Sequence, residues 1–312
     1  MGTRLTELLN IRYPILQGGM AWISDATLAV SVSEAGGAGI IASGGRETDW
    51  VRDQIRTAKK MTNKAFGVNV PLMASNKDDL IEMICKEKVC FVTMSAGNPI
   101  PYFPQLTAAG VLKIAVVPNA KLARRVEEYG ADAIVIEGME AGGHIGVLTT
   151  MALLTQVIPI VNLPVIAAGG FADGRGLAAA LLMGAAGIQI GTRFLIAEEC
   201  SVHPNFKEKL IQASEMDSVV TGQTIDQAVR GLRNSFSEKF LALERLNISK
   251  SELEKIAAGT NRLAAVEGDV ENGMVQAGQS LLPLIRIEPA ATIIEQIMET
   301  AQAALKQAPT LL

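Results

Sequence analysis

The sequence predicts an α/β protein: a (β/α)8 TIM barrel with a smaller, mainly helical lobe near the C-terminus. Short apolar runs rich in β-forming residues recur along the chain, and most are followed by a helical pattern. Several segments share one order, in which a helix ends at a glycine and an apolar strand begins soon after. The strand–helix units are roughly 20–30 residues long, as in a (β/α)8 barrel, and an open doubly wound sheet is the alternative.

Eight runs are predicted as strands because their apolar residues are continuous, which suits a parallel sheet covered on both faces. The predicted strands are Tyr13–Gln17, Ala38–Ala42, Phe66–Val70, Val89–Met94, Lys113–Val117, Ala133–Glu137, Pro164–Ala168 and Gly187–Gly191. Helices are expected between them, and Asp25 and Asp173 each precede one helix as a capping residue. Left-handed helix stops are predicted at Gly36, Gly110, Gly130 and Gly184.

The character of the chain changes after the eighth predicted strand. Residues 1–196 are expected to form the barrel domain. Residues 197–289 are more charged and helical in pattern, and are expected to form the smaller helical lobe. Residues 290–306 have the apolar spacing of an amphipathic helix, which is expected to return to the barrel wall as its last helix.

Composition excludes several classes of protein. The formal net charge of −4 over 312 residues provides no basic surface for nucleic acid. Three cysteines without C-x-x-C spacing argue against a disulfide framework and favour a reducing, cytoplasmic environment. No signal peptide is visible, and the uncharged segment Leu177–Thr192 is too short and too often interrupted by glycine to span a bilayer. We therefore expect a cytoplasmic protein without a nucleic-acid or membrane partner.

Two glycine-containing strand ends predict an anion site. Function in this barrel lies at the carboxyl ends of the strands, and phosphate commonly binds after the seventh and eighth. Gly169 and Gly170 follow the seventh predicted strand, and Gly191 and Thr192 follow the eighth. Glycines let backbone N–H groups approach an anion closely, to which Thr192 would add a hydroxyl and Arg193 a charge. The alternative is that the glycines only form a tight turn.

His144 is one of two histidines and is the candidate catalytic residue. It lies in a glycine-rich loop after the sixth predicted strand, where mobility would let it close over a ligand. Its imidazole can donate a hydrogen bond to a substrate oxygen or transfer a proton near neutral pH. The alternative is a histidine in a surface loop. His203 lies beyond the barrel strands and is expected to be structural or exposed.

Other candidate residues lie at the same predicted face. Glu137 ends the sixth strand, where it would form either an internal ion pair or a hydrogen bond to a cofactor hydroxyl. Asn69 ends the third strand and offers an amide to a cofactor ring. The cysteines are expected to be core residues, because none lies beside His144 as a nucleophile. Two distant histidines give no metal-site spacing.

Several motifs together resemble one known family. The segments "YPILQGGMAW", "FGVNV", "AGNP", "EGMEAGGHIG", "PVIAAGG" and "GTRF" are similar to those of the FMN-dependent enoyl-acyl-carrier-protein reductase II family, which is related to nitronate monooxygenases. The similarity extends from about residue 3 to the segment "VEGDVENGMVQAGQS" near residue 280, and so covers nearly the whole chain.

This resemblance implies a barrel that binds FMN non-covalently. The family's site maps by position onto matching residues of this chain. Gly169, Gly170, Gly191 and Thr192 would hold the FMN phosphate; Gly18, Gly19, Met20 and Asn69 would line the flavin ring; Glu137 would meet the ribityl chain; His144 would lie on the substrate side. The resemblance also implies a homodimer and, commonly, stimulation by a monovalent cation near the helical lobe, whose ligands the sequence does not assign.

The implied activity is reduction of trans-2-enoyl thioesters, carried on acyl carrier protein in bacterial fatty-acid synthesis, by NADH or NADPH. The alternative is a nitronate monooxygenase that oxidises alkyl nitronates with O2. Gly18-Gly19-Met20 favours the reductase, because many nitronate monooxygenases have Ala-Pro-Met there. Met94-Ser95 is a departure, since the reductases often have Thr-Gly. No G-x-G-x-x-G motif follows a strand, so a nicotinamide nucleotide would bind transiently and its type stays open. A third hypothesis is a flavin-free barrel that binds a sugar or nucleotide phosphate.

Overall fold

The computed structural model describes residues 2–310 and contains a barrel of eight parallel strands. The strands pair in the order β1-β9-β8-β6-β5-β4-β3-β2, and a parallel bridge between Leu16 and Ala38 joins the two ends of this order. The barrel strands are β1 (Ile15–Gln17), β2 (Gly39–Ala42), β3 (Phe66–Pro71), β4 (Phe91–Ser95), β5 (Leu112–Val117), β6 (Ala133–Glu137), β8 (Val165–Ala168) and β9 (Gly187–Ile190).

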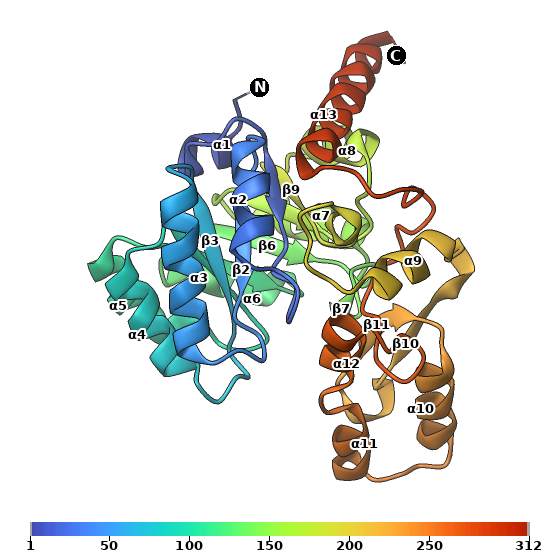
Figure 1. Cartoon of the computed structure of the whole chain (residues 1–312). Coiled ribbons are helices and arrows are strands. Elements are labelled where there is room, and N and C mark those ends of the chain that lie inside the picture. The colour runs from blue at the N-terminus through green and yellow to red at the C-terminus, as the bar shows by residue number, and fades with distance from the viewer. Residues whose placement is uncertain (1, 311–312) are drawn as a thin grey trace.

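Helices surround the barrel and cover the outer face of its sheet (Figure 1). The helices of this layer are α2 (Ala26–Glu34), α3 (Thr48–Met61), α4 (Lys77–Glu87), α5 (Phe103–Ala109), α6 (Ala120–Glu128), α7 (Thr150–Val157), α8 (Gly174–Leu182) and α13 (Ala290–Gln307). Short 3-10 helices join some of them: η1 (Ile100–Tyr102), η2 (Ile158–Ile160), η3 (Thr192–Ile196) and η6 (Ala308–Thr310). The last helix, α13, packs on α8 and α2, and comes so close to α8 that a Cβ at Gly174 would lie 2.0 Å from the Ile297 carbonyl oxygen.

The predicted barrel is confirmed, and the open-sheet alternative is wrong because β1 and β2 meet. Each of the eight predicted strands is present, with ends that differ by at most two residues. The side chains of Asp25 and Asp173 cap α2 and α8 by accepting from backbone N–H groups. Positive φ angles at the predicted helix stops confirm their left-handed conformation: 99° at Gly36, 71° at Gly110, 93° at Gly130 and 98° at Gly184.

The interior of the barrel is filled from the amino ends of the strands. Leu5 and Leu9 of α1 (Arg4–Leu9) belong to the same buried cluster as inward residues of the strands, such as Leu16 and Ile114. The Thr3 hydroxyl donates to the Ala186 carbonyl at the start of β9. Because α1 closes this end with apolar side chains, a cavity inside the barrel must open to solvent at the carboxyl ends of the strands.

Residues between η3 and α13 form a lobe on one side of the barrel (Figure 1). The lobe contains α9 (Pro204–Gln212), α10 (Ser235–Arg245), α11 (Lys250–Ala257), α12 (Thr260–Glu267), η4 (Glu215–Asp217), η5 (Gln223–Ile225), β10 (Ser218–Thr221) and β11 (Val229–Leu232). The two strands were not predicted. They form an antiparallel sheet in the order β10-β11-β7, and β7 (Gly143–His144) comes from the loop after β6 of the barrel. The lobe and the barrel therefore share a sheet at the candidate catalytic histidine.

No helix among residues 2–310 is long and apolar enough to cross a membrane. The division into a barrel domain and a lobe at the predicted boundaries stays a prediction, since the shared sheet and α13 both connect the two parts.

Candidate active site

A cavity of about 640 Å³ opens at the carboxyl ends of the barrel strands. It lies where the loops after the strands meet the segment that leads from the lobe to α13. The ten residues that the family resemblance assigns to the site all line this cavity: Gly18, Gly19, Met20, Asn69, Glu137, His144, Gly169, Gly170, Gly191 and Thr192. The structure thus brings together residues that are up to 174 positions apart in the sequence.

Asn69 and Gly19 fit against each other beside the cavity. A Cβ at Gly19 would lie 2.4 Å from the Asn69 Cβ, so only glycine fits there without a shift of the strand. The Asn69 amide nitrogen lies 3.1 Å from the Thr93 hydroxyl and 3.4 Å from that of Ser95. These contacts orient the Asn69 amide at the cavity wall, which suits hydrogen bonding to a polar ring edge.

Glu137 presents a carboxyl group to the cavity at the end of β6. The residue as a whole is half-buried because it borders the cavity. Its carboxyl group is nevertheless surrounded by protein atoms. Burial is the cause that raises the pKa of Glu137 to about 7, and no cation among residues 2–310 offsets it. The predicted internal ion pair is therefore wrong. Near neutral pH the carboxyl is partly protonated, so it can donate as well as accept a hydrogen bond.

The glycines after β8 and β9 leave space for an anion. Gly169 and Gly170 have φ angles of 96° and 82°, a region that favours glycine. A Cβ at Gly191 would have the Met20 sulfur as its nearest neighbour, at 3.7 Å, so a side chain there would fill the edge of the cavity. The Thr192 hydroxyl accepts from the Gly278 N–H at 2.8 Å and keeps its own proton for donation. These features fit the phosphate of a mononucleotide.

Arg193 does not line the cavity, and its expected role as an anion-binding charge is wrong. Its guanidinium is buried in an ion pair with Glu288 at 2.7 Å and also donates to the Pro283 carbonyl and the Gln296 amide oxygen. The side chain therefore fastens η3 to the segment before α13. The sequence placed Arg193 beside the correct strand end but gave no sign of the direction of its side chain.

His144 lies in another part of the cavity wall, in the part of the loop that forms β7. It pairs with Val229 of β11, and the Ile145 N–H donates to the Ala228 carbonyl at 3.0 Å. The imidazole is exposed to the cavity, yet the surrounding protein lowers its pKa below the usual 6.5 by desolvation. His144 is therefore mostly neutral at pH 7, with one ring nitrogen able to donate and the other able to accept.

Sequence reasoning missed two further parts of the wall. Glu140 lines the cavity, and its carboxylate accepts from the Thr150 N–H at 3.0 Å at the start of α7. The segment before α13 also lines the cavity, through Gln276, Ala277 and Gly278. It lies close to the His144 loop, since a Cβ at Gly142 would be 2.6 Å from the Ala277 carbonyl carbon. The sequence identifies the segment "QAGQS" only through the family resemblance, because no local pattern predicts that it packs against the strand ends.

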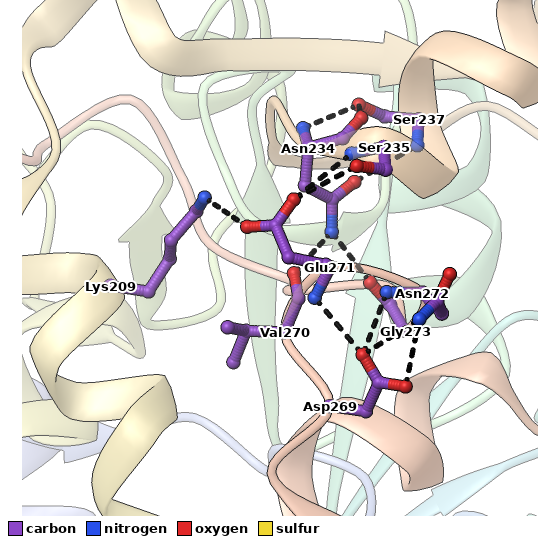
Figure 2. Close-up of polar contacts among 9 residues, drawn as sticks. All are labelled: Lys209, Asn234, Ser235, Ser237, Asp269, Val270, Glu271, Asn272 and Gly273. Atoms are coloured by element: carbon purple, nitrogen blue, oxygen red, sulfur yellow. Dashed lines mark hydrogen bonds and ion pairs between the residues drawn. The ribbon is translucent and has the colours of Figure 1, made fainter.

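A polar network in the lobe holds this far segment in place. Figure 2 shows Asn234, which follows β11 and caps α10, donating to the carbonyls of Val270 and Gly273. In the same network Asp269 accepts from Asn272, and Glu271 accepts from Lys209 and Ser235. The turn at residues 269–273 is thus fixed directly before the chain enters the cavity wall.

The remaining candidates lie away from the cavity lining. His203 caps α9, with its Nδ1 accepting from Asn205 at 3.2 Å, and its ring packs on Gly268, which is a structural role. Cys200 is buried, and Cys85 and Cys90 are half-buried. None of the three cysteines lines the cavity.

Comparisons with known proteins agree with this fold. FabK from Thermotoga maritima, a solved structure, matches with a TM-score of 0.97 and 46% identity over 100% of both chains. The (3aS,4S,5R,7aS)-5-hydroxy-7a-methyl-1-oxo-octahydro-1H-indene-4-carboxyl-CoA dehydrogenase of Rhodococcus jostii is 39% identical over 219 residues, which are 70% of this chain but only 62% of that protein. A probable nitronate monooxygenase of Staphylococcus aureus is 31% identical over 341 residues, covering 95% of this chain and 96% of the relative.

These matches place the chain among barrel oxidoreductases, a class in which flavin is the usual cofactor. A family model described as nitronate monooxygenase matches residues 2–83 and 72–300. The chain belongs to the nitronate monooxygenase family. The resemblance predicted from the motifs is confirmed.

Proposed function

We propose that this protein is an FMN-dependent enoyl-acyl-carrier-protein reductase that uses NADH or NADPH. The observation that carries the proposal is the match to FabK, an enoyl-acyl-carrier-protein reductase II, at 46% identity over the full length of both chains. The Rhodococcus relative supports a thioester substrate, because its name describes a carboxyl-CoA compound. The coarser conclusion, an oxidoreductase of this family, does not depend on the choice of substrate.

In this proposal the residues around the cavity would hold FMN with its phosphate at the glycines after β8 and β9. Backbone N–H groups near Gly169, Gly170 and Gly191, with the Thr192 hydroxyl, would hold the phosphate. Gly18, Gly19, Met20 and Asn69 would line the ring. Glu137 would hydrogen-bond the ribityl chain, as donor or acceptor according to pH. When bound, FMN would supply hydride transfer from the nicotinamide nucleotide to the enoyl double bond.

His144 would act on the thioester from the opposite wall. A neutral imidazole N–H directed at the thioester carbonyl oxygen would stabilise the negative charge that develops there during reduction. Such a donor is most effective when it is oriented before the reaction, and the pairing of β7 with β11 provides that orientation. His144 is also a candidate to give the α-carbon its proton, although polarisation alone requires no proton transfer.

Nitronate monooxygenase is the second candidate function. It is favoured by the family description and by the Staphylococcus relative, which covers nearly the whole chain. The same cavity and histidine would serve it, with the nitronate as substrate and O2 as oxidant. Ser95 lines the cavity at the position where the sequence departs from many reductases, and it is the residue with which the two candidates are best compared.

An anaerobic assay separates the candidates. Purified protein is mixed with NADH or NADPH and crotonyl thioester without oxygen, and nucleotide oxidation is followed beside an aerobic assay with an alkyl nitronate. A reductase consumes the nucleotide only when the thioester is present and needs no oxygen. If only the nitronate is consumed, and only with oxygen, the proposal is wrong and the second candidate is correct.

The colour of the purified protein tests the cofactor independently. Oxidised flavin absorbs at about 450 nm. Release of the flavin by heat, without proteolysis, would show that it is bound non-covalently. A colourless protein that binds no added FMN would instead favour the flavin-free phosphate-binding hypothesis. The homodimer and the stimulation by a monovalent cation stay predictions that the same preparation can test. The cytoplasmic location also stays a prediction.

A further inference from the structure

We propose that Arg230 of the lobe is a positioning residue that holds the His144 loop in its active conformation. The inference rests on the proposed catalytic role of His144 and extends it to a residue outside the cavity lining. Arg230 lies on β11, directly opposite Gly143 in the pairing of β11 with β7. It is 4% exposed, so its guanidinium is fixed among protein atoms.

The contacts of Arg230 reach the loop through its side chain as well as its backbone. Its Nε donates to the Met139 carbonyl at 2.8 Å, and one terminal nitrogen donates to the Ser218 hydroxyl of β10 at 2.8 Å. Met139 is located between the end of β6 and β7, so this bond fixes the start of the loop that carries His144. Ser218 in turn fixes the direction of the guanidinium from the far strand of the same sheet.

The charge of Arg230 is matched by a carboxylate in the loop. Burial lowers the pKa of Arg230, and the nearby carboxylate of Glu140 opposes this shift. Arginine remains charged even so, because its ordinary pKa is far above neutral. A buried cation needs partners, and the partners here are a carbonyl, a hydroxyl and the field of Glu140. Positive charge at this place therefore stabilises the loop conformation that brings Glu140 to the start of α7.

β11 holds two parts of the cavity wall at once. Along one edge, Val229 and Arg230 pair with β7, and the Leu232 N–H donates to the Val275 carbonyl at 2.8 Å. The His144 loop and the segment that contains Gln276 are thus aligned by four consecutive residues of one strand. A movement of Arg230 would shift His144 relative to the opposite wall, and an error of about 1 Å in such a distance can cost on the order of 100-fold in rate.

The test compares Arg230→Met with Arg233→Met, a matched control. Arg233 directly follows β11 and is exposed, so its replacement makes the same chemical change at a side chain that does not contact the His144 loop. We expect flavin-loaded Arg230→Met to lose on the order of 10- to 100-fold in kcat for enoyl-thioester reduction, while the KM for the nicotinamide nucleotide stays within about twofold. Arg233→Met should retain both parameters. Equal kcat in wild type and folded, flavin-loaded Arg230→Met would overturn the proposal.

Arg230→Lys keeps the test decisive if the methionine variant does not fold. Lysine retains the charge but lacks the fork that reaches both Met139 and Ser218, so kcat should lie between the wild-type and methionine values. Hydrogen–deuterium exchange gives a readout that needs no substrate: peptides over residues 138–148 should exchange faster in both Arg230 variants and be unchanged in Arg233→Met. Unchanged exchange in the Arg230 variants contradicts the proposal, whereas failure of wild type to reduce any enoyl thioester contradicts the proposed function instead.

Discussion

The glycine-rich wall of the cavity and the His144 wall are held in different ways. The first consists of strand ends of the barrel, Gly169–Gly170 after β8 and Gly191–Thr192 after β9, whose positions follow from parallel pairing. The second begins at the end of β6 but is held by β11, which comes 85 residues after His144 in the chain (229 minus 144). The glycines of the anion site are thus placed by barrel strands, with one contact from the later segment, Gly278 to Thr192, whereas the catalytic wall is held by a strand of the lobe.

The difference predicts how each wall responds to substitution. A change in the glycine-rich wall should act on cofactor affinity and leave the chemistry of bound flavin intact. A change in the His144 wall should act on the rate of the reaction and leave the flavin bound. Glu137 lies at the end of β6, between the two walls, and its effect should depend on pH.

His144→Ala is expected to have the largest effect. Loss of an oriented imidazole should lower kcat for enoyl-thioester reduction by about 100- to 10,000-fold, with flavin content unchanged. Steady-state kinetics and the visible spectrum measure both quantities. Full kcat in this variant contradicts the catalytic role of the residue.

The same experiment has a pH arm. Burial places the pKa of His144 below 6.5, so the imidazole is neutral above that value and becomes charged as the pH falls. If the neutral form is the active one, kcat stays level from neutral to mildly alkaline pH and decreases only at acidic pH, where the imidazole becomes charged. A decrease on raising the pH through this range would show that the charged form is needed.

Glu137→Gln is expected to change the pH dependence of stability in flavin-free protein. The pKa of Glu137 is raised from 4.5 in the unfolded chain to about 7, so the folded state holds a proton that the unfolded state has already lost. The free energy of unfolding should therefore fall as the pH rises from 4.5 to 7, by roughly 3 kcal/mol, and then level off. Glutamine removes this slope, and urea denaturation at several pH values measures it; parallel slopes in both proteins would contradict it.

Gly191→Val is expected to weaken FMN binding at least about tenfold, a cost of about 1.4 kcal/mol. The new side chain meets no atom closer than 3.7 Å at its Cβ, so the fold should survive while the edge of the cavity is filled. Gly2→Val makes the same change at an exposed position and serves as the control. Titration of flavin-free protein with FMN compares the two variants. Equal affinities would contradict the placement of the phosphate at the glycine-rich wall.

Ser95→Gly is expected to have the smallest effect. The substitution removes a hydroxyl from the cavity wall and one weak contact to Asn69, at 3.4 Å. We expect a change of a few-fold, on the order of 1 kcal/mol or less, in the ratio of enoyl-thioester to nitronate activity, with little loss of stability. Paired kcat/KM values for the two substrates measure the ratio, and an unchanged ratio removes Ser95 from the choice between the two activities.

The candidate site was predictable as far as strand ends could define it. Gly18, Asn69, Glu137 and Gly169 were identified because each lies at or directly after the end of an apolar strand, and parallel strands bring their carboxyl ends to one face. Arg193 was placed at the correct strand end with the wrong role, because a position in the chain does not give the direction of a long side chain. Glu140 and Gln276 were missed because no local pattern indicates that either residue lines the cavity.

By itself, the sequence determined the eight strands, the helix stops at positive-φ glycines and the barrel that these imply, because apolar periodicity and glycine conformation act over a few residues. Tertiary structure alone decided that β11 pairs with the His144 loop, that Arg230 points at Met139 and that Arg193 turns away from the cavity. Those contacts join residues 85 to 103 positions apart. Their energies depend on burial and geometry that exist only once the lobe has packed on the barrel.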